Sequence, residues 1–200
     1  MTHSEQIPSL KSSDLVPESK QEVAAQLPEN YIMLKNRLLA GDLDPVDFRN
    51  ILIQADQNTN DREASEDNYL LLKDPQVEHF LTNTEFRDGY FLLLSFTTLH
   101  CAQRLAMQEE GSTLAQKMFI EALSLKQKVS NPTEEDTAYL KATIAYFSGD
   151  TKRMEILKLK IDPNGTMKIN IKVLERLING LKEYGKPNYK RDYFGIEENA

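Results

Sequence analysis

Residues that start and end helices divide this chain at short intervals, and this punctuation limits the folds open to it. Asp44-Pro45 and Asp74-Pro75 each place an N-cap acid before a proline at the first helical position. Glycines follow several apolar stripes of helical period, where a left-handed C-cap belongs; they are Gly41, Gly111, Gly149 and Gly185. With eight Gly and eight Pro in 200 residues, the chain lacks the dense turns of all-β proteins. The sequence therefore predicts an all-α fold.

Apolar residues at helical spacing predict the individual helices. They are expected over residues 31–39, 45–55, 75–81, 84–110, 112–129, 133–147, 154–161 and 168–184. The polar and acidic stretch 56–68 predicts a loop, and 69–72 fits either a strand or a helix. The helix after Ser112 is expected to bury one stripe, formed by Leu114, Met118, Ala122, Leu125 and Val129.

Three segments follow from this pattern. Residues 1–27 are rich in Ser, Gln, Glu and Pro and predict a disordered N-terminal segment. Residues 28–185 form the helical domain, whose short loops favour antiparallel neighbours, so we expect stacked helical hairpins in a bundle or a short solenoid. Residues 186–200 are expected to form a partly extended C-terminal tail whose Tyr189, Tyr193 and Phe194 fold back onto the domain.

The charge of the chain is unevenly distributed. The formal net charge is −7, which argues against a general binder of nucleic acid or anionic membranes. Residues 151–191 nevertheless carry +7, so the remainder carries −14. This split is typical of solvated helix faces, but it also suits self-association or attraction of an acidic partner. Basic and aromatic residues interleave near its end, as in sites for single-stranded nucleic acid; they are Lys182, Tyr184, Lys186, Tyr189, Lys190, Arg191 and Tyr193.

Cysteine content and hydropathy point to the cytoplasm. Cys101 is the single cysteine, so no intrachain disulfide can form. The densest apolar run, 90–101, is too short and too often interrupted by polar residues to span a bilayer, and it predicts a buried helix. The N-terminus shows neither the basic nor the apolar region of a signal peptide. We expect a cytoplasmic protein without a membrane partner.

Part of the chain resembles a known repeat family. Ala115, Phe119 and Ala122 have the small–aromatic–small spacing of a second repeat helix, and 145–150 reads as the end of a first helix with its turn. Over about residues 99–165 the chain therefore resembles tetratricopeptide-type helical repeats. Gln103 departs from that pattern, because a small residue is expected there. The resemblance implies a concave surface that binds a protein or peptide.

A calcium-type loop is the second candidate pattern. Asp56, Asn58, Asn60 and Asp67 fall at positions 1, 3, 5 and 12 of an EF-hand-like loop, and their oxygens suit a hard cation. Asp61 occupies the position that requires glycine, so acidic turns with capping residues are the competing interpretation. A weaker partial match, 162–173, also lacks the glycine and ends in Val173 instead of an acid.

No catalytic motif is visible in the sequence. His100 and Cys101 are adjacent on a helix and point about 100° apart, so they cannot act as a nucleophile–base pair by themselves. Cys101 in an apolar helix is typical of an inert core residue. The sequence thus favours a non-enzymatic protein-interaction or scaffold module without a cofactor. The alternatives are a nucleic-acid binder through the basic C-terminal third and a helical protein that responds to a divalent cation.

Overall fold

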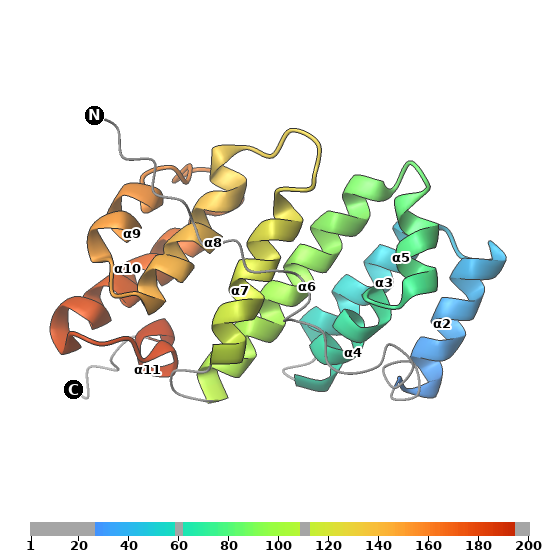
Figure 1. Ribbon diagram of the computed structural model, residues 1–200, viewed down its shortest axis with the longest axis horizontal. Helices are drawn as coiled ribbons and strands as arrows, with labels where there is room; N and C mark the ends of the chain where they lie inside the picture. The colour runs from blue at the N-terminus through green and yellow to red at the C-terminus, as the bar shows by residue number, and fades with distance from the viewer. Residues whose placement is uncertain (1–26, 59–61, 109–112, 195–200) are drawn as a thin grey trace.

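A computed structural model describes residues 27–58, 62–108 and 113–194 of the chain. These residues form ten helices and no strand, so the predicted all-α fold is confirmed (Figure 1). In order they are α2 (Glu29–Ala40), α3 (Pro45–Asn58), α4 (Arg62–Leu72), α5 (Pro75–Thr82), α6 (Arg87–Gln108), α7 (Thr113–Lys126), α8 (Glu134–Phe147), α9 (Thr151–Lys158), α10 (Lys168–Tyr184) and α11 (Tyr189–Phe194). Segment 1–26, expected to be disordered, lies outside the described residues; Leu27, the last residue of that expectation, is buried.

Several helix ends lie where the capping residues predicted them, whereas the predicted cap Gly111 lies outside the described residues. Gly41, Gly149 and Gly185 have φ values of 81°, 73° and 71°, the left-handed conformation of a C-cap. The side chain of Asp44 accepts a hydrogen bond of 2.7 Å from the Val46 N–H at the start of α3. Asp74 accepts from the first N–H groups of α5 in the same way. Local chemistry therefore decides most of the helix boundaries.

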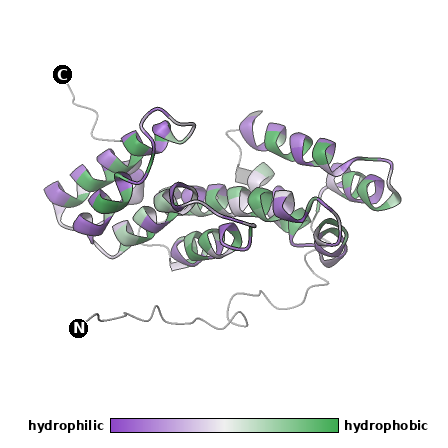
Figure 2. Cartoon of the chain, turned by 90° about the horizontal axis from the view of Figure 1, so that it is seen from above, coloured by the Kyte–Doolittle hydropathy of each residue, from purple (hydrophilic) through white to green (hydrophobic). Residues whose placement is uncertain are grey.

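The long helix α6 runs through the middle of the molecule and connects two apolar cores. Its N-terminal half shares one apolar core with α2–α5, where Tyr90 and Leu94 are buried. Its C-terminal half shares the other core with α7–α11, where Cys101 and Ala102 are buried. Figure 2 shows apolar positions all along this central helix, whereas the outer helices alternate between polar and apolar faces. A helix buried on several sides needs such a broad apolar surface.

The helices pack as a row of hairpins. Among the even-numbered helices, α2 packs on α4, α4 on α6 and α8 on α10. The odd-numbered helices α3, α5, α7 and α9 each pack on the even-numbered helix before and after them. Figure 1 shows the result as an elongated row that begins at α2 and ends at α9 and α10. Among the described residues, no helix is both long enough and apolar enough to cross a membrane.

The loop predicted over 56–68 is wrong, because helix α3 continues to Asn58 and α4 begins at Arg62. Three of the polar residues that suggested a loop, Asp56, Ser65 and Asn68, are instead buried. Asn68 donates to the carbonyl of Leu52 over 2.9 Å and accepts from the hydroxyl of Tyr31 over 3.1 Å. These contacts satisfy polar groups in the interior, so α4 lacks the apolar stripe by which a helix is recognised. The ambiguous run 69–72 is its last turn.

Two further predictions need correction. Of the stripe expected on α7, Met118, Ala122 and Leu125 are buried, but Leu114 at its start is 55% exposed. The tail is not extended over 189–194 but forms the short helix α11. Tyr189 does fold back onto the domain and is buried, and Tyr193 packs beside it, whereas Phe194 is largely exposed.

Candidate functional site

A polar cluster joins α3, α4 and α6 around the buried carboxylate of Asp56. Ser65 of α4 donates its hydroxyl to one carboxylate oxygen, and Nδ1 of His100 of α6 contacts the other. The guanidinium of Arg104, one turn further along α6, lies 3.9 Å from the first oxygen. Asp56 is 5% exposed, so this side chain is held by the protein and not by solvent. We call these four residues the Asp56 cluster.

The Asp56 cluster keeps its carboxylate ionised. Burial alone would raise the pKa of Asp56, but the hydrogen bond and charge of His100, the hydrogen bond from Ser65 and the charge of Arg104 outweigh it. The pKa of Asp56 therefore lies below its ordinary value. An ionised carboxylate can only accept hydrogen bonds, so Nδ1 of His100 carries the shared proton. The His100 side chain as a whole is 29% exposed.

This arrangement differs from a hydrolytic triad. In such a triad the hydroxyl bonds to the imidazole, which in turn bonds to the carboxylate. Here Ser65 bonds to Asp56 instead of His100 and is fully buried. The ring of His100 also lies against Phe96, with ring centroids 4.0 Å apart. The cluster therefore ties three helices together, and its serine and histidine do not lie in series.

The four residues proposed to bind a cation do not share one loop. Asp56 and Asn58 belong to the end of α3 and Asp67 belongs to α4, while Asn60 lies outside the described residues. The carboxylate of Asp56 is already bound by Ser65 and His100. In the described part of the chain, no three His, Cys, Asp or Glu side chains gather as a metal site would require. The cation hypothesis thus loses the loop on which it was based.

The weaker cation pattern forms an ordinary turn. Asp162 accepts from the N–H of Asn164 over 2.8 Å, which is an Asx turn. The N–H of Asp162 in turn donates to Glu135 of α8 over 3.2 Å. These contacts give the turn before α10 a structural explanation.

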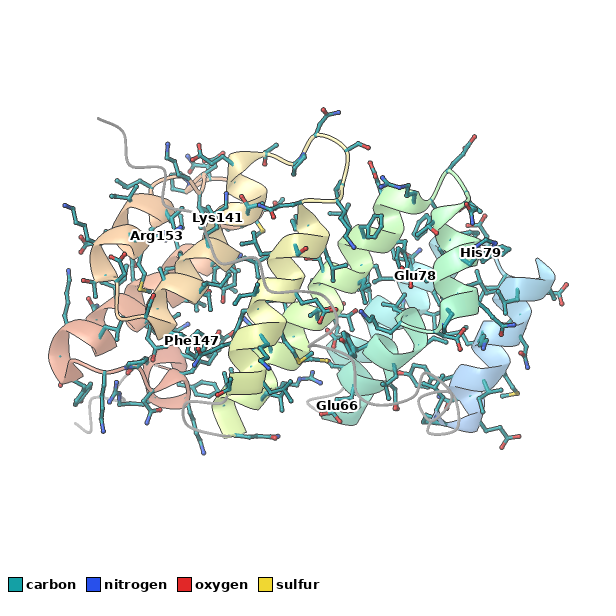
Figure 3. The ribbon with its side chains drawn as sticks, in the orientation of Figure 1. Glu66, Glu78, His79, Lys141, Phe147 and Arg153 are labelled. Atoms are coloured by element: carbon teal, nitrogen blue, oxygen red, sulfur yellow. The ribbon has the colours of Figure 1, made fainter. Side chains whose placement is uncertain are left out.

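A second cluster holds α11 against the body of the protein. Its aromatic part surrounds Tyr189, which is 3% exposed. The ring of Tyr189 lies 5.8 Å from both Phe119 and Phe147 and 5.9 Å from Tyr146, measured between centroids. Figure 3 labels Phe147 at the end of α8 that faces α7 and α11. Helices α7, α8 and α11 therefore meet at one aromatic group.

The polar part of the second cluster surrounds Asp192, which is 2% exposed. The hydroxyl of Tyr146 donates to its carboxylate over 2.5 Å, and Nε of Arg191 bonds to the other oxygen. The carboxylate lies against Gly180 of α10, where a Cβ would come within 2.2 Å of it. We call Phe119, Tyr146, Phe147 and Gly180 the α11 seat.

The tyrosines of this region keep their protons. Burial raises the pKa of Tyr189 well above its ordinary value, and the neighbouring Tyr139 adds to the shift. Burial also raises the pKa of Tyr146, as does its bond to Asp192. Tyr146 is therefore a hydrogen-bond donor to Asp192 at physiological pH, and neither hydroxyl has the low pKa of an activated nucleophile.

The residues proposed to bind nucleic acid are partly engaged elsewhere. Tyr189 is buried, and Tyr193 packs against it with centroids 5.4 Å apart. Tyr184 is 42% exposed, but the guanidinium of Arg191 lies 3.8 Å from its ring centroid. Lys182 forms an ion pair of 2.6 Å with Glu155. The stretch therefore does not present the row of open stacking surfaces that base binding requires.

Cys101 is a core residue, as predicted. Its thiol is buried and donates to the carbonyl of Ser65 over 3.2 Å. Burial raises its pKa to about 12, so the reactive thiolate is scarce at neutral pH.

Sequence reasoning missed the partners of Asp56 and the whole α11 seat. Ser65 and His100 gave no spacing signal, because they lie on two helices that only the fold brings together. Gly180 did give a signal. A glycine inside a strongly amphipathic helix lowers helix stability, so it indicates a close approach of another segment.

Searches for similar proteins found no match to this chain among protein-family models, curated proteins or solved structures.

Proposed function

We propose that this chain is a non-enzymatic protein-interaction module. The observation that carries the proposal is the row of helical hairpins, in which α3, α5, α7 and α9 each pack on the helix before and the helix after them. Arrays of helical hairpins expose an extended surface along the row, and such surfaces commonly bind proteins. The Asp56 cluster favours a structural role over a catalytic one, because its serine and histidine both bond to the carboxylate instead of to each other.

The spacing of the helices agrees with the repeat resemblance in one part of the chain. Helix α8 begins at Glu134 and α10 at Lys168, 34 residues later, which is the tetratricopeptide repeat length. The positions that carried the resemblance in α7, Ala115, Phe119 and Ala122, are fully buried, as packing positions should be. The other intervals between the starts of successive even-numbered helices differ from 34 residues. We therefore propose an irregular hairpin array instead of a run of equal repeats.

A reconstituted complex tests the proposal. Nuclease-treated lysate passed over the immobilised chain should yield a protein that, once purified, binds with a defined stoichiometry in calorimetry. A matched column of Phe119→Asp, in which a buried core ring becomes a charge, controls for binding by unfolded protein. If no purified candidate binds the native chain better than this control, the interaction function is wrong.

Nucleic-acid binding is a second candidate because part of the basic surface is unpaired. Among the described residues, six exposed basic side chains of the C-terminal third form no ion pair: Lys152, Arg153, Lys168, Lys172, Lys186 and Lys190. Figure 3 shows Arg153 on α9, at the same end of the molecule as Lys141 of α8. Anisotropy with a labelled single strand should then show an affinity that falls steeply with salt. Weak binding without a salt slope would exclude this candidate.

A further inference from the structure

The row of hairpins has an end helix on each side. Among the described residues α2 is the first helix, and it packs on α3, α4 and α5. At the opposite end of the row, α9 packs on α8 and α10 (Figure 1). In an array of stacked helices the terminal units keep the protein soluble when their outer faces are polar. The residues on the outer faces of α2 and α9 therefore decide whether a further helix can stack there.

The outer face of α2 has an exposed apolar residue at its centre. Tyr31 and Leu38 are the buried residues of this helix. The side turned away from them carries Glu29, Met33 and Asn36, all exposed and spaced as one helical stripe. Met33 in the middle is 55% exposed. We call these three residues the α2 strip.

The outer face of α9 has the same layout and is more apolar. Met154 is the buried residue of this helix. The side turned away from it carries Lys152, Ile156 and Leu159, with the same spacing. Ile156 is 52% exposed and Leu159, which keeps helical backbone angles at the C-cap, is 81% exposed. Single exposed apolar residues are common, but here two lie one turn apart. We call these three residues the α9 strip.

The two strips carry opposite charges. Each begins with its one charged residue, Glu29 in the α2 strip and Lys152 in the α9 strip, and neither forms an ion pair within the described part of the chain. Arg37 and Asp42 flank the α2 strip with opposite charges, and Glu155 beside the α9 strip is paired with a lysine of α10 over 2.6 Å. Unlike strips therefore attract each other, whereas like strips repel.

We propose that the α9 strip of one copy of this chain binds the α2 strip of a second copy, so that the row of hairpins continues from molecule to molecule. In a parallel alignment Lys152 meets Glu29, and Ile156 packs on Met33. The two surfaces differ, and such a contact builds open chains or rings instead of closed dimers. The inference rests on the proposed interaction function and names a second copy as the partner. Two helix faces form a small interface, so the association is reversible and grows with concentration.

Sedimentation velocity of full-length variants tests the inference. The unchanged chain should form species larger than a dimer as its concentration rises from micromolar to millimolar. Met33→Asp blocks the α2 strip and Ile156→Asp blocks the α9 strip, because each places a charge against an apolar residue. Each variant alone should stay monomeric, since it keeps one of the two surfaces. An equimolar mixture should form a dimer through the two intact strips. The matched control is Leu114→Asp on α7, where the native residue is also 55% exposed, and it should associate as the unchanged chain does.

Charge reversal gives an independent measurement. Glu29→Lys should weaken the association at least about tenfold, and adding Lys152→Glu to the same chain should restore it. Both positions are exposed, so neither change should alter the fold, and circular dichroism checks this. A double variant that associates no better than Glu29→Lys alone would overturn the inference.

The remaining outcomes separate this inference from the function on which it rests. An unchanged chain that stays monomeric over the whole range, or a mixture of the two blocked variants that forms no dimer, would overturn the inference. Equal loss of association in Leu114→Asp would overturn it too, because the contact would then not lie at the ends. If the chain is monomeric but a captured protein of different sequence binds it stoichiometrically, the interaction function stands and the second copy is not its partner.

Discussion

Gly180 of α10 lies so close to Asp192 of α11 that a Cβ on Gly180 would come within 2.2 Å of the carboxylate. The two residues are twelve positions apart, on different helices. Asp192 is fixed in this position by the hydroxyl of Tyr146 over 2.5 Å. The glycine therefore decides whether α11 can dock.

Gly180→Ala should destabilise the protein, although alanine is the better helix former. In an open helix this change stabilises by about 1 kcal/mol, but here the collision with Asp192 should cost about 1–3 kcal/mol net, the usual range for overpacking. Urea unfolding measures the difference. The exposed neighbour Asn179 provides the matched control, since Asn179→Ala should be neutral or stabilising. In the Asp192→Gly background, Gly180→Ala should cost much less, and an unchanged cost would disprove the collision.

Asp56→Ala should be strongly destabilising because it leaves Ser65 and His100 without their acceptor. Loss of a buried charged acceptor with two donors is expected to cost about 2–4 kcal/mol. The exposed Gln54 on the same helix serves as control, and Gln54→Ala should change stability by less than about 0.5 kcal/mol. Equal effects of the two substitutions in thermal or urea unfolding would mean that the cluster does not hold the three helices together.

The same carboxylate predicts a pH dependence. The folded-state pKa of Asp56 is below its unfolded value near 3.8, so its contribution to stability is present above that value and is lost as the pH falls through the folded pKa. The unfolding free energy of the native chain minus that of Asp56→Asn should shrink as the pH falls below about 4. Denaturant titrations at a series of pH values measure it. A difference that stays constant down to pH 2 would contradict the lowered pKa.

Two adjacent residues at the start of α7 should respond differently to substitution. Leu114 is 55% exposed, so Leu114→Ser should change stability by about 0.5 kcal/mol or less. Ala115 is fully buried, so Ala115→Leu should overpack the core at a cost of about 1–3 kcal/mol. Melting temperatures of the two variants measure the difference, and the reverse order would mean that Leu114 is buried, as the sequence predicts.

Cys101 should react with a thiol reagent only when the protein opens. Its thiol is buried and its pKa is raised to about 12 by that burial. Labelling with a disulfide reagent at pH 8 should therefore be slow in buffer and fast in urea. A native rate close to that of the unfolded chain would show that the interface between α4 and α6 is open.

Helices with a clear local signal could be predicted from the sequence, and helices held by distant partners could not. Helix α5 was recognisable because Asp74 and Pro75 define its start and an apolar stripe follows. Helix α4 was not, because its inward residues include Ser65 and Asn68, whose partners belong to other helices. Helix α11 was not predicted, for a related reason. Six residues are too few for a periodic pattern, and its order depends on Tyr146 and Gly180.

The candidate sites divide in the same way. The sequence indicated Asp56 as a residue of interest but suggested the wrong neighbours, because it offered only residues nearby in the chain. The structure pairs Asp56 with His100, 44 positions away. What the sequence by itself determined is where most helices begin and end, since capping by Asp44, Asp74 or Gly185 is decided within a few residues. Which helices touch, and therefore which polar and aromatic groups form sites, only the tertiary structure decided, because those contacts join residues that no local pattern relates.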